Sequence, residues 1–357
     1  MSKKPLILGI ESSCDETAAS LITENEEGFP VVLSNIVSSQ VEVHKEFGGV
    51  VPELAARSHI EKIDWIVKKA IDESGRKIEE IDAVASTAGP GLIVCLSVGL
   101  SFGKAFATAM NKPFIAVNHL EGHALSPKLN TNLNYPYLLL LISGGHSQYL
   151  SVQNLGKYKR LGTTIDDALG EAFDKTAKLL GIEFPGGPQI EILAKKGDPE
   201  KYDLPKPIFS KGGCNLSFAG LKTAVLKISK TIKSEQDKYD LAASFQKTIE
   251  EILYKKTKIA FTEFEKINEL NEKIFVVAGG VAANKKIRSL LINLCEENNY
   301  KSIFPPIEFC GDNAAMIAMV GLEKFKIKQY NNLDYPAKPR WPLDENAAFL
   351  KGAGVKI

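Results

Sequence analysis

Residues 6–23 of the chain read LILGIESSCDETAASLIT, and this stretch decides the fold. Two apolar runs, 6–11 and 17–23, flank five polar or turn-forming residues, and a third apolar run follows at 31–38. Short apolar runs separated by turn residues are typical of antiparallel hairpins rather than of crossover connections. The N-terminal segment is therefore predicted to form three successive antiparallel strands.

The rest of the chain repeats this order in a second half. Apolar spacing after the first hairpins predicts, in order, helix, strand, helix and strand at 53–74, 82–87, 92–110 and 114–117. From Tyr137 onward it predicts strands at 138–143, 147–152 and 158–161, a helix at 164–180, a strand at 273–278 and a helix ending at Cys295. The repeated order suggests an internal duplication in an α/β protein with a ligand cleft between two lobes.

The composition excludes several classes of protein. With 44% apolar residues the chain is not disordered, and its five scattered cysteines favour neither a disulfide scaffold nor a cysteine zinc site. The apolar stretch at 91–110 is interrupted by Lys104, so we expect no membrane span and a cytoplasmic protein. Because the net charge is only +1, any nucleic acid must bind a local patch, such as 195–233 with nine lysines against three acids.

The strongest chemical signal is the segment HLEGH at 119–123. His119 and His123 are four residues apart, so a helix would place both imidazoles on one face, and neutral imidazole is a common ligand of zinc or iron. A metallopeptidase of the HExxH type would need Glu at position 120, where this chain has Leu. Asp312, just before a predicted helix at 314–322, is a candidate third ligand. It is also a candidate N-cap for that helix, which is the commoner role of such an Asp, and spacing alone leaves both open.

Glycine-rich turns form a second constellation, at 143–146 (SGGH), 184–188 (FPGGP) and 278–280 (AGG). Such turns let backbone N–H groups approach an anionic ligand, and two of the three directly follow a predicted strand, so a nucleotide cleft is favoured. Asp167, Glu171 and Asp174 would form an acidic stripe on a helix, facing either solvent or a ribose or cation. Asp15 and Glu16, in the first hairpin turn, have the same ambiguity.

Six segments together resemble one family. They are 9–17 (GIESSCDET), 119–123 (HLEGH), 143–146 (SGGH), 170–175 (GEAFDK), 217–223 (SFAGLKT) and 279–284 (GGVAAN). In this order they are similar to the bacterial branch of the TsaD family of tRNA N6-adenosine threonylcarbamoyltransferases, formerly called glycoproteases. The resemblance extends from about Leu6 to a tail at 340–344 (RWPLD), which is nearly the whole chain.

The resemblance implies a two-lobed actin/sugar-kinase/Hsp70-like fold with a duplicated ribonuclease-H-like core. Its first lobe would comprise 1–130, completed by 310–357, and its second lobe 131–309. It also implies a reaction: transfer of the threonylcarbamoyl group from threonylcarbamoyl-adenylate to N6 of adenosine 37 in tRNAs that read ANN codons. The expected partners besides tRNA are a paralogous TsaB-like protein of the same fold and a small TsaE-like ATPase.

The resemblance also assigns residues. His119, His123 and Asp312 would hold one metal ion, iron or zinc. The adenylate would bind at Leu141, Ile142, Ser143, Gly144, Gly145, Asp174, Gly187, Glu191 and Asn284. Two positions depart from the family pattern, since Glu191 replaces the more usual Asp and Ala219 replaces the more usual Ser.

The chemistry requires a base as well as an activated donor, because an exocyclic adenine amine is a poor nucleophile. We expect Asp15 or Glu16 to accept the proton lost from N6. Two alternatives remain open from the sequence. The glycine-rich turns would also suit an ATP-dependent small-molecule kinase of the same fold. The histidine pair by itself would suit a metallopeptidase, which Leu120 disfavours.

Overall fold

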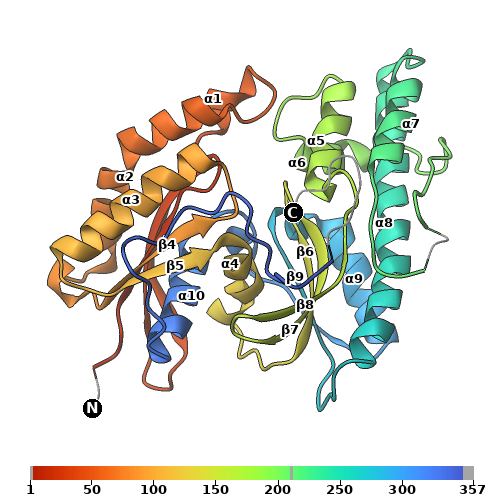
Figure 1. The fold of residues 1–357 in the computed structure, drawn as a ribbon. Coiled ribbons are helices and arrows are strands. Elements are labelled where there is room, and N and C mark those ends of the chain that lie inside the picture. Colours follow the sequence, from red (N-terminus) through yellow and green to blue (C-terminus); the bar gives the residue numbers. More distant parts are fainter. Residues whose placement is uncertain (1–2, 210–211, 349–357) are drawn as a thin grey trace. The chain divides into compact units, whose positions relative to one another are not determined.

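The computed structural model of the chain describes residues 3–209 and 212–348 (Figure 1). These residues form two compact units. Unit 1 contains the described residues up to Leu133 together with Pro305–Glu345, and unit 2 contains Asn134–Phe304 and the described residues from Asn346 onward. The lobe boundaries expected from the sequence stay a prediction.

Unit 1 is built on a five-stranded sheet with the order β3-β2-β1-β4-β5. The strands are β1 (Ile7–Glu11), β2 (Glu16–Glu24), β3 (Pro30–Ser39), β4 (Ala83–Gly89) and β5 (Phe114–Asn118). β1, β2 and β3 pair antiparallel, with Ile7 opposite Ile22 at one end of the first hairpin, as the N-terminal segment predicts. β1, β4 and β5 are parallel, so their carboxyl ends lie at one edge of the sheet.

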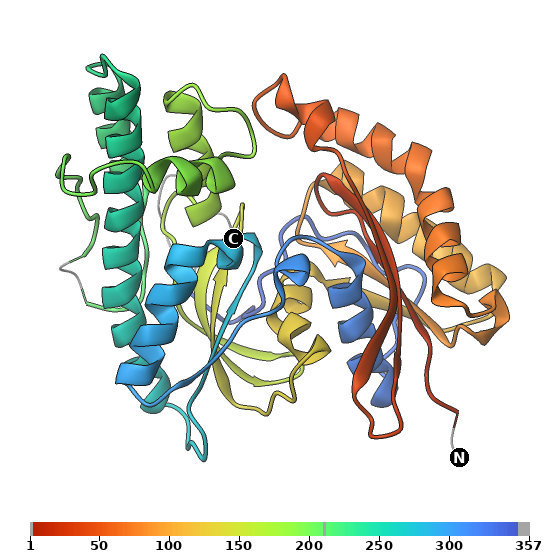
Figure 2. The same ribbon diagram turned by 180° about the vertical axis from the view of Figure 1, so that it is seen from behind.

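Helices cover both faces of this sheet (Figures 1 and 2). α2 (Pro52–Ser74) and α3 (Ile93–Ala109) lie on one face and α10 (Ala314–Lys326) on the other, and two short helices, α1 (Val41–Lys45) and α4 (His119–Leu125), follow β3 and β5 in the chain. Leu8 and Ile10 of β1 belong to the apolar core that α2 and α3 form on one face. Gly9 points to the other face, where a Cβ would clash with the backbone of α10 at Ala314. Successive residues of a strand face opposite sides of its sheet, so β1 packs against α2 and α3 with one set of residues and against α10 with the other.

Unit 2 repeats the topology of unit 1. Its strands are β6 (Tyr137–Ile142), β7 (Ser147–Asn154), β8 (Lys157–Thr163), β9 (Ile274–Ala278) and β10 (Lys301–Ile303). Their order is β10-β9-β6-β7-β8, in which β6, β7 and β8 pair antiparallel and β6, β9 and β10 pair parallel. Read from its other edge, the order β8-β7-β6-β9-β10 matches the order β3-β2-β1-β4-β5 of unit 1, strand for strand. The duplication that the sequence suggested is therefore confirmed at the level of topology.

The helices of unit 2 are α5 (Leu169–Leu179), α6 (Gly186–Ala194), α7 (Ala219–Ser229), α8 (Glu235–Glu265) and α9 (Lys285–Glu297). α8 is long and begins at a capping box in which Ser234 and Asp237 bond reciprocally to each other's backbone N–H. Its phenylalanines pack edge to face on neighbouring elements, Phe245 on Phe173 of α5 and Phe261 on Phe275 of β9. Sequence analysis made no prediction for this helix.

The helix predicted at 164–180 begins five residues later, at Leu169. The carboxylate of Asp166 accepts hydrogen bonds from the backbone N–H groups of Phe218 (2.7 Å) and Ala219 (3.2 Å), where α7 begins. These tertiary bonds hold the preceding residues as a loop, because an Asp side chain that bonds to backbone competes with helix formation. The predicted acidic stripe is therefore wrong for Asp167, which lies before the helix.

Short 3-10 helices complete the description, at Ile78–Glu80, Ser126–Leu129, Gly280–Ala283 and Ile307–Phe309. Among the described residues, no helix combines the length and apolar character that crossing a membrane requires.

Candidate functional site

The first candidate site lies at the carboxyl edge of the sheet in unit 1. β1 ends at Glu11 and β5 ends at Asn118, directly before His119. Parallel strands deliver their carboxyl ends to the same place, and α/β folds commonly bind ligands there. The side chain of Asn118 accepts hydrogen bonds from the N–H groups of Leu120 (2.9 Å) and Glu121 (3.4 Å), which fixes the start of α4 at His119.

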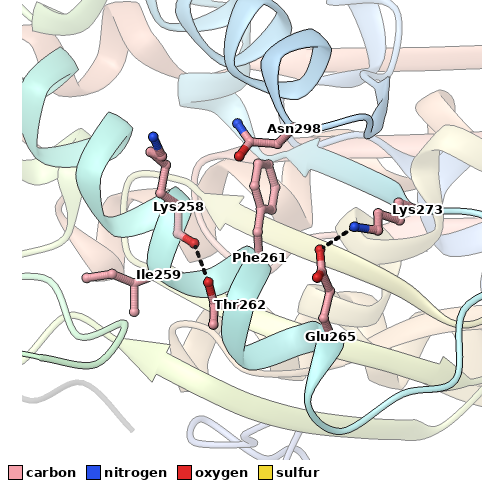
Figure 3. A pocket seen from close by; sticks show the side chains of 7 residues that line it. All are labelled: Lys258, Ile259, Phe261, Thr262, Glu265, Lys273 and Asn298. Atoms are coloured by element: carbon pink, nitrogen blue, oxygen red, sulfur yellow. Dashed lines mark hydrogen bonds and ion pairs between the residues drawn. The ribbon is translucent and has the colours of Figure 1, made fainter.

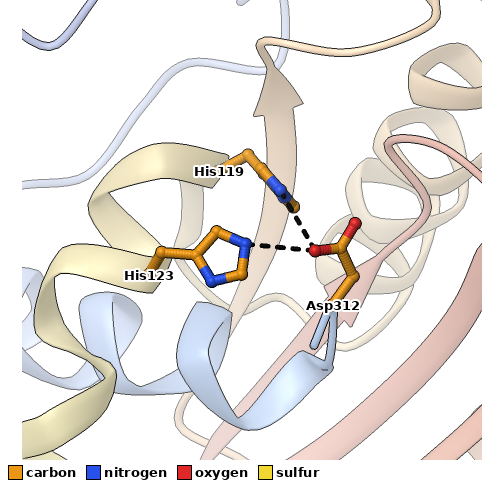
Figure 4. A group of neighbouring side chains, drawn as sticks. All are labelled: His119, His123 and Asp312. Atoms are coloured by element: carbon orange, nitrogen blue, oxygen red, sulfur yellow. Dashed lines mark hydrogen bonds and ion pairs between the residues drawn. The ribbon is translucent and has the colours of Figure 1, made fainter. Parts of the chain in front are cut away.

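α4 presents both histidines to one point (Figure 4). His119 is 7% exposed and His123 is fully buried, and their rings meet edge to face with centroids 4.8 Å apart. Two imidazoles four residues apart on a helix lie on the same face. Glu121 points elsewhere and forms a buried ion pair of 2.8 Å with Lys324 of α10, which ties the two helices together.

Asp312 completes this cluster, which we call the His–His–Asp cluster. One carboxylate oxygen, Oδ1, lies 3.0 Å from Nε2 of His123 and 3.5 Å from Nε2 of His119 (Figure 4). The N-cap of α10 is the next residue, Asn313, whose side chain accepts from the N–H of Met316 at 3.1 Å. Since Asn313 does the capping, the carboxylate of Asp312 is left to face the histidines.

Glu11 contacts the His–His–Asp cluster through Nδ1 of His119, while Nε2 of that ring faces Asp312. No role was predicted for Glu11 from the sequence. Nδ1 of His119 donates to Oε2 of Glu11 at 3.0 Å, and the hydroxyl of Thr87 at the end of β4 donates to the same oxygen at 2.6 Å. A carboxylate on the far nitrogen of a ligating histidine fixes the tautomer and ring orientation. The signal available in the sequence was a glutamate ending an otherwise apolar strand.

The charges of the cluster are interdependent. Burial disfavours protonation of His119, but the carboxylates of Asp312 and Glu11 outweigh it and raise the pKa of His119 well above its usual range. Burial likewise opposes ionisation of Asp312, yet the two histidines hold its pKa well below the usual range. Both carboxylates therefore stay ionised beside the imidazoles. A proton on His119 or a divalent cation supplies the positive charge that they need.

The donor set fits a metal ion. The candidate ligand atoms of His119, His123 and Asp312 all lie within 4.8 Å of one another, a spread that one ion with bonds of about 2.0–2.2 Å can bridge after small rotations. Two imidazoles and one carboxylate form a set used by non-haem iron(II) and by catalytic zinc, in each case leaving positions open for substrate. Such an arrangement can polarise a carbonyl oxygen.

Asp15 and Glu16 follow at the end of the turn after β1. Asp15 is 8% exposed, and Glu16 is the first residue of β2. Burial, followed by the carboxylates of Asp312 and Asp15, raises the pKa of Glu16 well above its usual range. The structure thus brings both predicted acids into the electrostatic surroundings of the His–His–Asp cluster, with Glu16 favouring its protonated form.

The second candidate site lies at the equivalent edge of unit 2. β6 and β9 are parallel, so the loop that begins at Ser143 lies beside the one that begins at Gly279, where φ is +96° and a Cβ would clash with the carbonyl oxygen of Ile142. Ser143 closes its loop by donating its N–H to the carbonyl oxygen of His146 (2.8 Å) and accepting the N–H of His146 on its Oγ (3.1 Å). We call these two segments the glycine-rich loops.

Gly144 is not required by the protein's own packing. A Cβ built on it or on Gly145 would meet no atom of the described residues within 4 Å, and neither glycine has a positive φ. Their smallness therefore leaves the backbone N–H groups of the loop accessible, as an anionic ligand would need. Leu141 and Ile142 are different, because both side chains are fully buried within β6 and only their backbone could reach a ligand.

The remaining predicted ligand residues hold the second site together. Asp174 accepts the N–H of Gly186 (2.8 Å) beside Gly187, and Glu191 accepts the N–H of Lys285 (3.0 Å). Asn284 caps α9 by accepting the N–H of Ile287 at 3.0 Å, and its amide donates to Gln246 of α8 at 3.0 Å. Gln246 is a member of this site that sequence analysis missed, because α8 was not predicted.

A pocket of about 410 Å³ lies elsewhere in unit 2 (Figure 3). It is lined by Lys258, Ile259, Phe261, Thr262, Glu265, Lys273 and Asn298, and its two facing charges, Lys273 and Glu265, pair at 2.8 Å. None of the predicted site residues lines it. The chemistry of the molecule is therefore better sought at the two strand edges than in this pocket.

Comparison with known proteins decides the family. A family model described as TsaD: tRNA N6-adenosine threonylcarbamoyltransferase matches residues 31–319. This chain belongs to the TsaD family. A TsaD relative from Pelagibacter ubique, a tRNA N6-adenosine threonylcarbamoyltransferase, is 80% identical over 357 residues and covers 100% of both chains. One of the same name from Rickettsia conorii is 54% identical over 342 residues, which are 95% of this chain and 98% of the relative.

Solved structures that resemble this TsaD chain share only its fold. Full-length HypF in the phosphate- and nucleotide-bound form has a TM-score of 0.59 at 13% identity, over 93% of this chain and 48% of HypF. HypF of T. kodakarensis has a TM-score of 0.61 at 13% identity, over 93% and 49%. The family is confirmed, and so is the predicted α/β fold of the actin/sugar-kinase/Hsp70-like class.

Proposed function

We propose that this chain transfers a threonylcarbamoyl group from threonylcarbamoyl-adenylate to N6 of adenosine 37 in tRNAs that read ANN codons. Membership of the TsaD family supports the transfer and the tRNA substrate, and it favours a transferase over an ATP-dependent small-molecule kinase. The observation that carries the proposal within the structure is the His–His–Asp cluster at the carboxyl edge of unit 1.

His119, His123 and Asp312 would hold one metal ion, Fe²⁺ or Zn²⁺, which would supply Lewis-acid polarisation of the carbamoyl carbonyl. Glu11 accepts the Nδ1–H of His119 and thereby keeps Nε2 of that ring directed towards Asp312. The ion pair between Glu121 and Lys324 holds α4 against α10, which keeps the histidines close to Asp312.

The adenylate binds at the carboxyl edge of unit 2. Backbone N–H groups of the loop at Gly144 and Gly145 contact its phosphate, in space where a Cβ on either glycine would meet no atom of the described residues within 4 Å. The carboxylates of Asp174 and Glu191, each of which can accept more than one hydrogen bond, accept the ribose hydroxyls. Gly187 and Asn284 complete the surroundings of the nucleoside. Glu191 is longer than the usual Asp, and its carboxylate can still reach a ribose hydroxyl.

Asp15 takes the proton that N6 of adenosine loses on acylation. Of the two candidate acids it is the better base, because burial and neighbouring carboxylates raise the pKa of Glu16 and favour its protonated form. The N6–C bond forms as the bond from the acyl carbon to the adenylate phosphate oxygen breaks, and AMP leaves. Full turnover by Asp15→Asn at saturating adenylate would exclude this role.

The enzyme works in the cytoplasm with a TsaB-like paralogue and a TsaE-like ATPase. Its near-neutral charge supports a shared tRNA surface, since one chain with a net charge of +1 creates no general attraction for RNA. The lysine-rich segment at 195–233 supplies local phosphate contacts.

A single-turnover assay tests the proposal. The protein, threonylcarbamoyl-adenylate, an ANN-reading tRNA and the two partners are mixed, and the modified nucleoside is quantified by mass spectrometry after digestion. Asp312→Ala is compared with Asp334→Ala, which removes an exposed carboxylate of the same unit. We expect product from the wild type and from Asp334→Ala, and at least ~100-fold less from Asp312→Ala. No product from the folded wild type with all partners present contradicts the proposal.

A further inference from the structure

A buried polar network lies behind the turn that carries Asp15, and the mechanism above does not use it. Its members are Thr17 of β2, Gln40, His44 of α1 and His59 of α2, each at most 1% exposed. Burying a polar side chain lowers the stability of a fold unless that side chain is hydrogen-bonded. Hydrogen bonds connect all four of these side chains, and such a connected network invites a functional explanation.

The hydrogen bonds run in one direction through the network. The N–H of Val51 donates to Nδ1 of His44 (3.3 Å), so the proton of that ring is on Nε2, which faces Oε1 of Gln40 at 3.4 Å. The amide nitrogen of Gln40 then faces Nδ1 of His59 at 3.3 Å, and the hydroxyl of Thr17 lies 2.7 Å from the same nitrogen. His59 Nδ1 is thus the acceptor, and Nε2 carries its proton.

That proton is directed at the backbone of the turn. Nε2 of His59 donates to the carbonyl oxygen of Cys14 at 3.0 Å. The carbonyl on either side is also held, that of Ser13 by the N–H of Leu92 (2.8 Å) and that of Asp15 by the N–H of Gln40 (3.0 Å). Three successive carbonyls are therefore fixed by donors from three separate segments of the chain, and of these three donors only that of His59 is a side chain.

The ring of His59 is suited to this task. Burial lowers its pKa, although the Cys14 carbonyl opposes the shift, so the imidazole stays neutral with one donor and one acceptor nitrogen. Thr17 and Gln40 fix which nitrogen has the proton. The peptide that His59 holds joins Cys14 to Asp15, so its orientation sets the direction in which the Asp15 side chain leaves the turn.

We propose that His59 is a positioning residue of the transfer reaction, which holds Asp15 in place through the carbonyl of Cys14. The inference rests on the proposed role of Asp15 as the base. A misplacement of about 1 Å in a reacting group can reduce a rate by about 100-fold, so one hydrogen bond to the turn is sufficient to matter.

Two substitutions at His59 separate positioning from packing. The amide of Gln reaches the position of Nε2 and still donates to Cys14, whereas the amide of Asn reaches only the position of Nδ1. We expect His59→Asn to lower kcat for modified adenosine by ~10–100-fold with KM for the adenylate and for tRNA within ~2-fold of wild type. His59→Gln should recover to within ~5-fold of wild type. Equal losses in both variants, or none in either, would overturn the inference.

A double mutant tests the route through Asp15. If His59 acts by placing that carboxylate, His59→Asn in an Asp15→Asn background should cause less than ~2-fold further loss. A full additional loss would show a role independent of Asp15 and would contradict the inference. Wild-type protein that makes no product would instead contradict the proposed function, so the two failures are distinguishable.

Variants of Thr17 keep the inference testable should the His59 variants not fold. Thr17→Val preserves the shape and removes the hydroxyl that faces Nδ1, and Thr17→Ser retains that hydroxyl. We expect a ~3–10-fold lower kcat for Val and less than ~2-fold for Ser, at equal melting temperatures. Indistinguishable rates for Val and Ser would count against the inference.

Discussion

Units 1 and 2 have the same strand order but carry different chemistry at the same edge. In unit 1 the carboxyl ends of the parallel strands lead to ionisable side chains, Glu11, His119 and the nearby Asp312. In unit 2 the equivalent ends lead to the glycine-rich loops, where Gly144 leaves backbone exposed. The topology determines where the loops gather, and the residues in those loops determine whether the edge suits a cation or an anionic nucleotide.

The largest expected effect concerns the stability of unit 1. Lys324→Met removes the 2.8 Å ion-pair partner of the buried Glu121 carboxylate, and breaking a buried pair from one side costs about 3–5 kcal/mol of unfolding free energy. Urea denaturation measures this loss. Adding Glu121→Leu should restore most of the stability, because the double variant buries neither charge of the pair. A single variant as stable as the wild type would show that the pair does not hold α4 to α10.

Removing a proposed metal ligand from unit 1 comes next. His119→Ala should lower single-turnover formation of modified adenosine by at least ~100-fold, since the electrostatic help of the ion is lost along with it. KM for the adenylate should stay within ~3-fold of wild type, because the glycine-rich loops of unit 2 are unchanged. A comparable rise in KM would contradict the assignment of metal binding to the edge of unit 1 and of adenylate binding to the edge of unit 2.

The carboxylate of Glu11, which accepts the Nδ1–H of His119, should affect the affinity for the metal without being a ligand itself. Glu11→Gln keeps an acceptor for Nδ1 but removes the charge, so we expect the metal dissociation constant to rise by ~10–100-fold. Competition with a chelator gives this constant. An unchanged constant would mean that Glu11 serves the fold alone.

A size series at Gly144 tests the edge of unit 2. Because a Cβ there meets no atom within 4 Å in the part of the chain that the structure describes, Gly144→Ala and Gly144→Val should melt within a few degrees of wild type. KM for the adenylate should rise by ~3-fold for Ala and ~10–30-fold for Val, as the side chain occupies the space over the loop. If KM is insensitive to side-chain size, the adenylate does not bind over this loop.

The smallest effect is expected on tRNA binding. Lys227, Lys230 and Lys233 are exposed on α7 and just after it, and they form no ion pair with the residues that the structure describes. Replacing all three by Gln should weaken tRNA binding ~3–10-fold and reduce its salt dependence, because each phosphate contact contributes about 0.7–0.9 to the slope of log K against log salt. Lysines that only stabilise the helix C-terminus would instead lower the melting temperature and leave affinity unchanged.

All strands of both units except β10 could be predicted from sequence, because a short apolar run between turn residues is a local signal. β10 is only three residues long and buries only Ile303, so it contains no such run. The helix at α5 was placed five residues early because the bonds that hold Asp166 come from α7, about fifty residues later in the chain. Local periodicity contains no information about such partners. α8 was missed for a different reason, since no prediction was made for its stretch of sequence.

For the candidate site, the histidine spacing was visible in the sequence and its surroundings were not. Whether Asp312 capped a helix or faced His123 depended on Asn313, which competes for the same cap. The support from Glu11 depends on β1 and β5 ending at the same edge, which is a property of the sheet. The same applies to His59, whose partner Cys14 lies 45 residues earlier.

Measuring metal and adenylate binding in the same two variants tests whether the two edges bind different ligands. His119→Ala and Gly144→Val are each assayed for bound metal by elemental analysis and for binding of a non-reactive analogue of threonylcarbamoyl-adenylate by calorimetry. We expect that His119→Ala loses the metal and keeps analogue affinity within ~3-fold, whereas Gly144→Val keeps the metal and binds the analogue at least ~10-fold more weakly. Loss of both ligands in either variant, with the protein folded, would contradict it.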